Sequence, residues 1–205
     1  MAEPFTILTS LPAPLIRDNI DTDQIIPSRE MKTTGKTGLA DGLFAGWRYT
    51  AIGGREPDPS FVLNDPQFAD SKIILGGTNF GCGSSREHAV WALAEYGIRA
   101  IIAPSFAPIF FDNCVRNGIL PAVLDAEAVV EIEADRGFMT IDLAAQSISL
   151  KSGKQWGFAI ESEPKSMLLE GLDAIDLSLK MASEIAAWQQ ADRNARPWIY
   201  LGVNQ

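Results

Sequence analysis

Short apolar runs alternate with longer helix-forming segments through the middle of the chain. Residues 73–75, 100–103 and 119–124 are runs of strand length, and residues 89–96 and 107–116 between them are rich in helix formers. Glycines at 97 and 118 follow the two helical segments, where C-terminal caps are expected. The pattern therefore predicts a parallel β-α-β-α-β core, in which ligands bind at the carboxyl ends of the strands.

A different pattern, alternation of apolar and polar positions over short segments, lies outside this core. It predicts a first strand over residues 5–9 and an antiparallel meander over residues 139–143, 147–150 and 156–160. Pro12 and Pro14 interrupt the segment after the first strand. Residues 125–134 fit either a short helix or a strand, and Val129 and Val130 leave the choice open.

The C-terminal part of the chain has helical character. Residues 163–169 and 182–194 are predicted helices, and Pro197 ends the second. Trp188 follows Ile185 at a helical spacing, which favours packing over ligand recognition. We expect residues 1–205 to form a single domain with a helical extension over about residues 163–205.

Composition narrows the possible functions. The net charge of −9, without a cluster of Lys or Arg, argues against nucleic-acid binding. The N-terminus lacks the pattern of a signal peptide, and no apolar run is long enough to span a bilayer. Two cysteines without a disulfide pattern favour the reducing cytoplasm, and they are too few to hold an iron–sulfur cluster.

The most informative stretch is the turn at residues 77–89, between a predicted strand and a predicted helix. Its glycines allow a sharp bend and close approach of a ligand. Ser84, Ser85 and Arg86 fall where the helix begins, and free N–H groups with a guanidinium suit a carboxylate or phosphate. From spacing alone, a plain glycine-rich connector is as good an interpretation.

The complete motif resembles a known family. Residues 83–89 (Gly-Ser-Ser-Arg-Glu-His-Ala) are similar to the signature of the aconitase superfamily's swivelling domain. Residues 79–82, 19–27 and 104–121 resemble blocks of the stand-alone small subunit of 3-isopropylmalate dehydratase. The resemblance covers most of the chain and implies an α/β fold, an aconitase-like swivelling β/β/α domain with antiparallel strands beside the parallel core.

The resemblance also implies a function. Such small subunits isomerise 2-isopropylmalate and 3-isopropylmalate through 2-isopropylmaleate, a dehydration and rehydration in leucine biosynthesis. They are active only with a large subunit, and here the [4Fe-4S] cluster is expected on that partner, with no metal on this chain. The residues that match the family's site are Ser84 as the catalytic base, Ser85 and Arg86 as binders of a substrate carboxylate, and Asp23, Asn79 and Gly83 as supports of the active site.

One departure from the family pattern concerns the substrate. The loop at residues 28–54 is expected to cover it, and the positions after Pro27 often carry an apolar pair where this chain has Glu30 and Met31. Glu30 either points to solvent or indicates another substrate. The alternatives are therefore a 2-methylmalate/citraconate or 2,3-dimethylmalate dehydratase subunit, or a non-catalytic anion-binding module.

The remaining reactive side chains have simpler interpretations. His88 is favoured as a structural histidine early in the helix, and Glu87 as a residue that complements the helix dipole or forms an ion pair. A nucleophilic Cys82 is possible at a helix start but lacks an ordered Cys-His-Asn set. Cys114 follows Phe110 at a helical spacing and is expected in the core.

Overall fold

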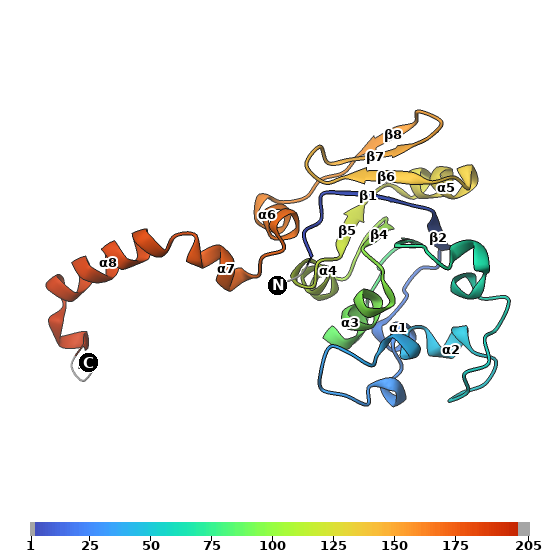
Figure 1. Cartoon of the computed structure of the whole chain (residues 1–205), viewed down its shortest axis with the longest axis horizontal. Helices are drawn as coiled ribbons and strands as arrows, with labels where there is room; N and C mark the ends of the chain where they lie inside the picture. The colour runs from blue at the N-terminus through green and yellow to red at the C-terminus, as the bar shows by residue number, and fades with distance from the viewer. Residues whose placement is uncertain (1–2, 201–205) are drawn as a thin grey trace.

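The computed structural model describes residues 3–200 and arranges their strands in two four-stranded sheets (Figure 1). One sheet is parallel with the order β2-β3-β4-β5, and the other is antiparallel with the order β1-β6-β7-β8. The strands are β1 (Ile7–Ser10), β2 (Pro12–Leu15), β3 (Ile73–Gly76), β4 (Ala100–Ala103), β5 (Leu120–Val123), β6 (Met139–Asp142), β7 (Ser147–Leu150) and β8 (Gln155–Gly157). The predicted α/β class, with a parallel core and additional antiparallel strands, is confirmed.

Two helices connect the strands of the parallel core, as predicted. Helix α3 (Glu87–Tyr96) joins β3 to β4, and α4 (Pro108–Arg116) joins β4 to β5. Gly97 ends α3 in the left-handed region with φ 107°, which a residue with a Cβ adopts at a cost. Because the strands are parallel, the loops that precede α3 and α4 leave the sheet at the same edge.

The strand β2 was not predicted from the sequence. Pro12 and Pro14 lack an N–H donor, and so they indicated an interruption. In the structure β2 is the edge strand of the parallel sheet, where it pairs only with β3. An edge strand needs ladder donors on one side only, which is why prolines are tolerated there.

The antiparallel sheet confirms the predicted meander and first strand. β6, β7 and β8 follow one another, and β1 pairs with β6. The ambiguous segment after β5 is helix α5 (Ala126–Asp135). Val129 and Ile132 are three residues apart on this helix, and both are buried in the core. Residues at this spacing share one face of a helix, whereas in a strand they point to opposite faces.

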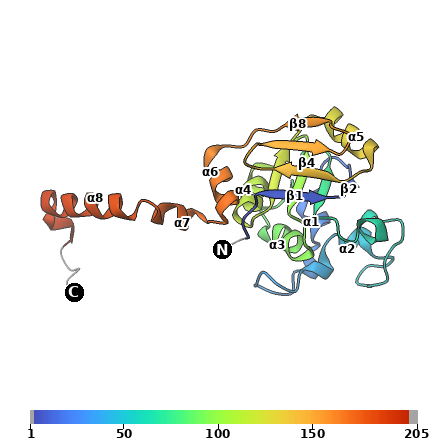
Figure 2. The same ribbon diagram turned by 45° about the horizontal axis from the view of Figure 1, so that its top comes forward.

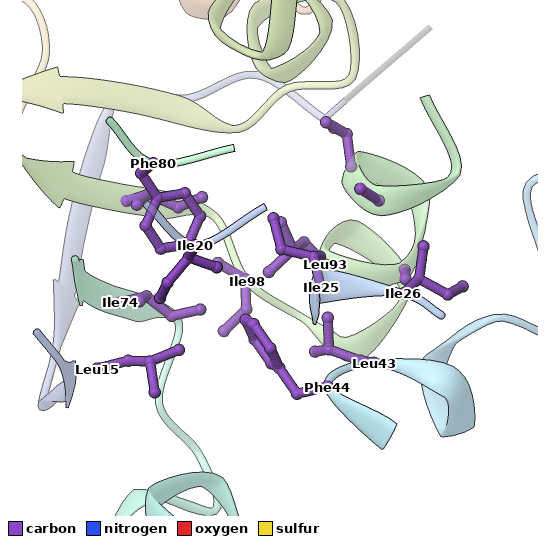
Figure 3. Packing of buried hydrophobic residues seen from close by; sticks show 14 of the residues in the cluster. Leu15, Ile20, Ile25, Ile26, Leu43, Phe44, Ile74, Phe80, Leu93 and Ile98 are labelled. Atoms are coloured by element: carbon purple, nitrogen blue, oxygen red, sulfur yellow. The ribbon is translucent and has the colours of Figure 1, made fainter. Parts of the chain in front are cut away.

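Alternate residues of the parallel strands face two separate cores. Ile74 of β3 belongs to a core with Leu93 of α3, which Figure 3 shows at close range. Its neighbours Ile73 and Leu75 belong to a second core shared with the antiparallel sheet and α5. The parallel sheet is thus covered on both faces, as its nearly continuous apolar strands require.

Short helices fill the connections, and a helical segment follows β8. They are α1 (Thr22–Ile25), α2 (Ala45–Arg48), α6 (Ser162–Glu170), α7 (Ala174–Leu179) and α8 (Ala182–Ala195), with single 3-10 turns η1 (Ser28–Glu30), η2 (Ala40–Gly42), η3 (Val62–Asn64), η4 (Pro66–Phe68) and η5 (Pro197–Tyr200). Within residues 3–200, no helix is both long and apolar enough to cross a membrane.

The C-terminal helices project from the body of the molecule. Met167 and Leu168 of α6 are buried in the second core and Leu177 of α7 packs against it, whereas α8 extends away from it (Figures 1 and 2). None of the described residues of α8 is buried, and Trp188 is 62% exposed. The expectation that Trp188 packs in the fold is therefore wrong. The single-domain organisation with this extension stays a prediction, and residues 1–2 and 201–205 lie outside the described part.

Candidate active site

Three segments that are far apart in the sequence meet at the carboxyl edge of the parallel sheet. The turn after β3 pairs on one side with the start of α1, where the N–H of Gly81 donates to Ile20 O (2.7 Å) and that of Thr22 to Cys82 O (2.9 Å). On its other side the N–H of Phe80 donates to Ser105 O (3.0 Å), before α4. The three blocks that carry the family resemblance are therefore neighbours in space.

Two glycines determine the backbone conformation of the turn after β3. Gly81 and Gly83 have φ values of 77° and 90°, in the left-handed region. A Cβ at Gly81 would overlap the ring of Phe110 in α4. The main chain thus passes directly over the start of α4, and only glycine fits at this point.

Ser84, Ser85 and Arg86 lie together after this turn, immediately before α3. They line a hollow of about 190 Å³ with Thr22 of α1 and with Phe110 and Asn113 of α4. Ser84 and Ser85 are exposed, and Arg86 is half-buried. The N-cap position of α3 is Arg86, whose side chain makes no capping bond to the helix. The first N–H groups of α3 therefore contribute positive potential beside the two hydroxyls.

The guanidinium of Arg86 is held by Asp23. Nη1 of Arg86 donates to Oδ1 of Asp23, and the Ser28 hydroxyl donates to the same oxygen at 3.1 Å. The hydrogen bond from Arg86 is the main cause of a pKa of Asp23 below its ordinary value. At neutral pH the two side chains are an ion pair that orients the guanidinium. Because guanidinium carries five N–H donors, a ligand carboxylate can still bind beside Asp23.

The other predicted support residue, Asn79, lies outside this hollow. Its backbone has φ 58°, and its amide Nδ2 donates to Oδ1 of Asn19 at 2.9 Å. The N–H of Asn79 also donates to the Ser105 hydroxyl at 2.8 Å. Asn79 thus holds together the three converging segments. Its role in supporting the active site stays a prediction.

Two residues that line the hollow were not singled out from the sequence. Thr22 is buried and donates its hydroxyl to Ser84 O at 2.9 Å. Asn113 is a nearly buried polar residue of α4. Thr22 lies in the block at residues 19–27 and Asn113 in the block at residues 104–121, so the family resemblance already covered both residues. Their proximity to Ser84 depends on the fold.

Glu30 does not face the hollow of Ser84. It is buried, and Arg55 Nη2 donates to its carboxylate at 2.6 Å. The interpretation that Glu30 points to solvent is therefore wrong, and the pairing with Arg55 removes the objection to a charge at this position. The neighbouring Met31 lines a second hollow, which also contains Ser85 and Arg86.

The loop at residues 28–54 is fastened to α3 by one carboxylate. Glu95 accepts hydrogen bonds from the backbone N–H groups of Gly38 (2.6 Å), Leu39 (2.5 Å) and Ala40 (2.9 Å). The loss of hydration at this contact raises the pKa of Glu95, but the three donors together outweigh it and leave the pKa below its ordinary value. The expected substrate loop is thus attached to α3, the helix whose N-cap residue is Arg86.

The cysteines of this chain do not fit an iron–sulfur cluster. Cys114 is completely buried in α4, as predicted, and burial raises the pKa of its thiol well above the ordinary value. Cluster ligands are thiolates, and about four are required. Over residues 3–200, no group of three or more His, Cys, Asp or Glu side chains is placed to hold a metal ion.

The fold and the arrangement of the turn together define an α/β domain of the aconitase type. The family model described as aconitase C-terminal domain matches residues 2–127. This region contains the turn, α1, α3 and α4.

Comparison with individual proteins is more specific. The chain is 56% identical to a 3-isopropylmalate dehydratase small subunit of Cupriavidus necator, over 97% of this chain and 98% of the relative. It is 46% identical to the small subunit of Neisseria meningitidis, over 97% of this chain and 99% of the relative. A crystal structure of 3-isopropylmalate dehydratase from Methanocaldococcus jannaschii superposes with a TM-score of 0.66 at 29% identity, covering 89% of this chain and 99% of the other. The chain belongs to the 3-isopropylmalate dehydratase small-subunit family of aconitase-type hydro-lyases.

Proposed function

We propose that this chain supplies one half of the active site of a cytoplasmic 3-isopropylmalate dehydratase. The large subunit, which the small-subunit family implies, would supply the other half together with a [4Fe-4S] cluster. The main support is the grouping of Ser84, Ser85 and Arg86 on one exposed hollow, with Arg86 oriented by Asp23. The reaction moves the hydroxyl of 2-isopropylmalate to the neighbouring carbon, through 2-isopropylmaleate.

In this proposal Arg86 and Ser85 hold a carboxylate of the substrate. The guanidinium fork matches a carboxylate in geometry, and the Ser85 hydroxyl adds a donor at the same hollow. Asp23 binds Arg86 at one nitrogen and leaves the other N–H donors of the fork available to the substrate. Substrate charge is thus bound in an otherwise acidic protein.

Ser84 is proposed to take the proton from the carbon beside the carboxylate and to return one on rehydration. A serine hydroxyl is a weak base in water, so its alkoxide must be stabilised. The guanidinium of Arg86 and the first N–H groups of α3 provide positive potential at this position. Departure of the hydroxyl is assigned to the large subunit.

Reconstitution tests the proposal. The chain is co-expressed with the large subunit of the same organism, purified anaerobically with iron and sulfide, and assayed with 2-isopropylmalate. We expect turnover by the complex and none by either subunit alone. Parallel assays with 2-methylmalate and 2,3-dimethylmalate should give a lower kcat/KM. A complete, cluster-loaded complex without turnover of 2-isopropylmalate would disprove the function.

A further inference from the structure

The helical segment after α6 carries large apolar side chains that the described fold leaves exposed. They include Ile175 (70%), Leu179 (62%), Met181 (52%), Trp188 (62%) and Trp198 (64%). Isolated apolar residues on a surface are ordinary, but a set gathered on one projecting segment indicates a binding surface. Figure 2 shows α8, the last long helix of this segment, separate from both sheets.

On α8 the apolar residues form a single stripe. Met181, Ile185 and Trp188 are spaced by four and three residues, and so they lie on one face of the helix. The rest of α8 is mostly polar or alanine. An amphipathic helix with such a stripe is typical of helices that bind in an apolar groove of a partner. We call Met181, Ile185 and Trp188 the α8 stripe.

A continuous surface joins the Ser84 hollow to the base of this segment. Arg86 lines both that hollow and a second one of about 670 Å³, which also contains Trp91 of α3. Trp91 in turn lines a third hollow of about 640 Å³, which reaches Leu172 and Ile175. A protein that covers Arg86 and extends along α3 therefore arrives at the start of α7.

We propose that the α8 stripe docks in an apolar groove of the large subunit, which covers the surface from Arg86 through Trp91 to Ile175. The inference rests on the proposed function, because that function requires a partner to close over Ser84. A second copy of this chain is a poorer fit at the same surface. The hollow beside α7 mixes apolar residues such as Trp91 and Leu172 with the charged residues Lys36, Glu87 and Glu95, so it does not offer a wholly apolar groove to the stripe of a second copy.

The test uses the full chain with two substitutions, Ile185→Glu and Trp188→Glu, and measures its affinity for the cluster-loaded large subunit by calorimetry. We expect the Kd to rise at least tenfold, because two buried contacts would become carboxylates in an apolar groove. With saturating large subunit, kcat should stay within about twofold of wild type, since Ser84 and Arg86 are unchanged. The milder Trp188→Ala should weaken association in the same direction.

Val130→Glu is the matched control. Val130 is 55% exposed on α5, beside the antiparallel sheet and away from α8 (Figure 1). The Kd of the Val130→Glu variant for the large subunit should equal that of wild type, and circular dichroism should show that all variants are folded. Wild-type affinity in the double variant would overturn the proposal.

Two further results separate the possible failures. If wild-type chains associate with each other through the stripe in sedimentation, while the double variant is monomeric and binds the large subunit normally, the occupant is a second copy and the proposal is wrong. If wild type binds the large subunit through the stripe but the complex has no turnover, only the proposed catalytic function fails. No binding of the large subunit by wild type would overturn both.

Discussion

The hydroxyl of Thr22 donates a 2.9 Å hydrogen bond to the main-chain oxygen of Ser84, 62 residues later in the sequence. Thr22 is buried at the start of α1, directly after its N-cap residue Asp21. The capping box between Asp21 and Gln24 fixes this start, with Gln24 N donating to Asp21 Oδ1 at 2.7 Å. The position of the proposed base therefore depends on a short helix from the N-terminal part of the chain.

Thr22→Val should lower activity by misplacing Ser84. The substitution keeps the shape of the side chain but removes one of two donors to the carbonyl of Ser84, which still accepts from the N–H of Arg86 at 2.7 Å. The expected cost is therefore about 1 kcal/mol in unfolding free energy. A displaced base should reduce kcat/KM by about 10–100-fold. Thr22→Ser keeps the hydroxyl and should retain most activity. Equal activity of the two variants in the reconstituted complex would exclude a positioning role for this bond.

Ser84→Ala should remove catalysis without affecting the fold. Ser84 is exposed, so thermal unfolding and binding of the large subunit should be unchanged. Loss of a general base should lower kcat by about 10²–10⁴-fold. Ser85→Ala is the control, because a residue that binds the carboxylate should change KM more than kcat. Near-normal kcat in Ser84→Ala would assign the base to another residue.

Arg86→Lys keeps the positive charge and removes the planar fork. A lysine cannot make two parallel bonds to a carboxylate, and so we expect KM for the substrate to rise about 10–100-fold. Steady-state kinetics at several substrate concentrations measures this. Asp23→Asn leaves the guanidinium in place and tests its orientation separately. An unchanged KM in Arg86→Lys would mean that the substrate carboxylate binds elsewhere.

The periodicity of apolar residues predicted most of the fold, because packing on both faces of the parallel sheet leaves a strong local pattern. Strand β2 was missed, since Pro12 and Pro14 are tolerated only because that strand lies at an edge. Trp188 was expected to pack, because its spacing from Ile185 has the same local pattern as a core helix. Local spacing identifies an apolar face but does not identify what covers it.

Only the part of the site that is local in the sequence could be predicted. Ser84, Ser85 and Arg86 are adjacent in the sequence, and so the motif alone placed them together. The hydrogen bond from Thr22 to Ser84 and the attachment of the 28–54 loop by Glu95 join residues about 55 to 62 positions apart. Such contacts depend on tertiary packing, and they cannot be predicted from the local spacing of residue types.

Gly81→Ala should destabilise the protein because of the close approach to α4. A Cβ there overlaps the Phe110 ring in addition to the strain of φ 77°, so we expect a loss of roughly 3 kcal/mol or more in unfolding free energy. Gly97→Ala is the matched control, with φ 107° but no atom within 4 Å of the new Cβ, and should cost about 1 kcal/mol. Denaturant unfolding compares the two. Equal losses of unfolding free energy in the two variants would mean that α4 shifts to make room for the new Cβ.

Glu95→Gln should change how stability depends on pH. The folded-state pKa of Glu95 lies below its ordinary value, so its stabilising effect is complete above the unfolded pKa of about 4.3 and is lost as the pH falls through the folded pKa. A neutral amide is a weaker acceptor for the N–H groups of Gly38, Leu39 and Ala40. At pH 7 we expect Glu95→Gln to unfold about 1 kcal/mol more easily, a modest value because Glu95 is an exposed residue.

The difference between wild type and Glu95→Gln should then shrink between roughly pH 5 and pH 3, because wild type loses the charge that the variant lacks. Urea unfolding at a series of pH values measures it, and hydrogen exchange at residues 38–40 should be faster in the variant at pH 7. Glu127→Gln, an exposed glutamate on α5, controls for the change in net charge. A difference from wild type that stays constant across this pH range would show that the carboxylate charge of Glu95 does not hold the loop.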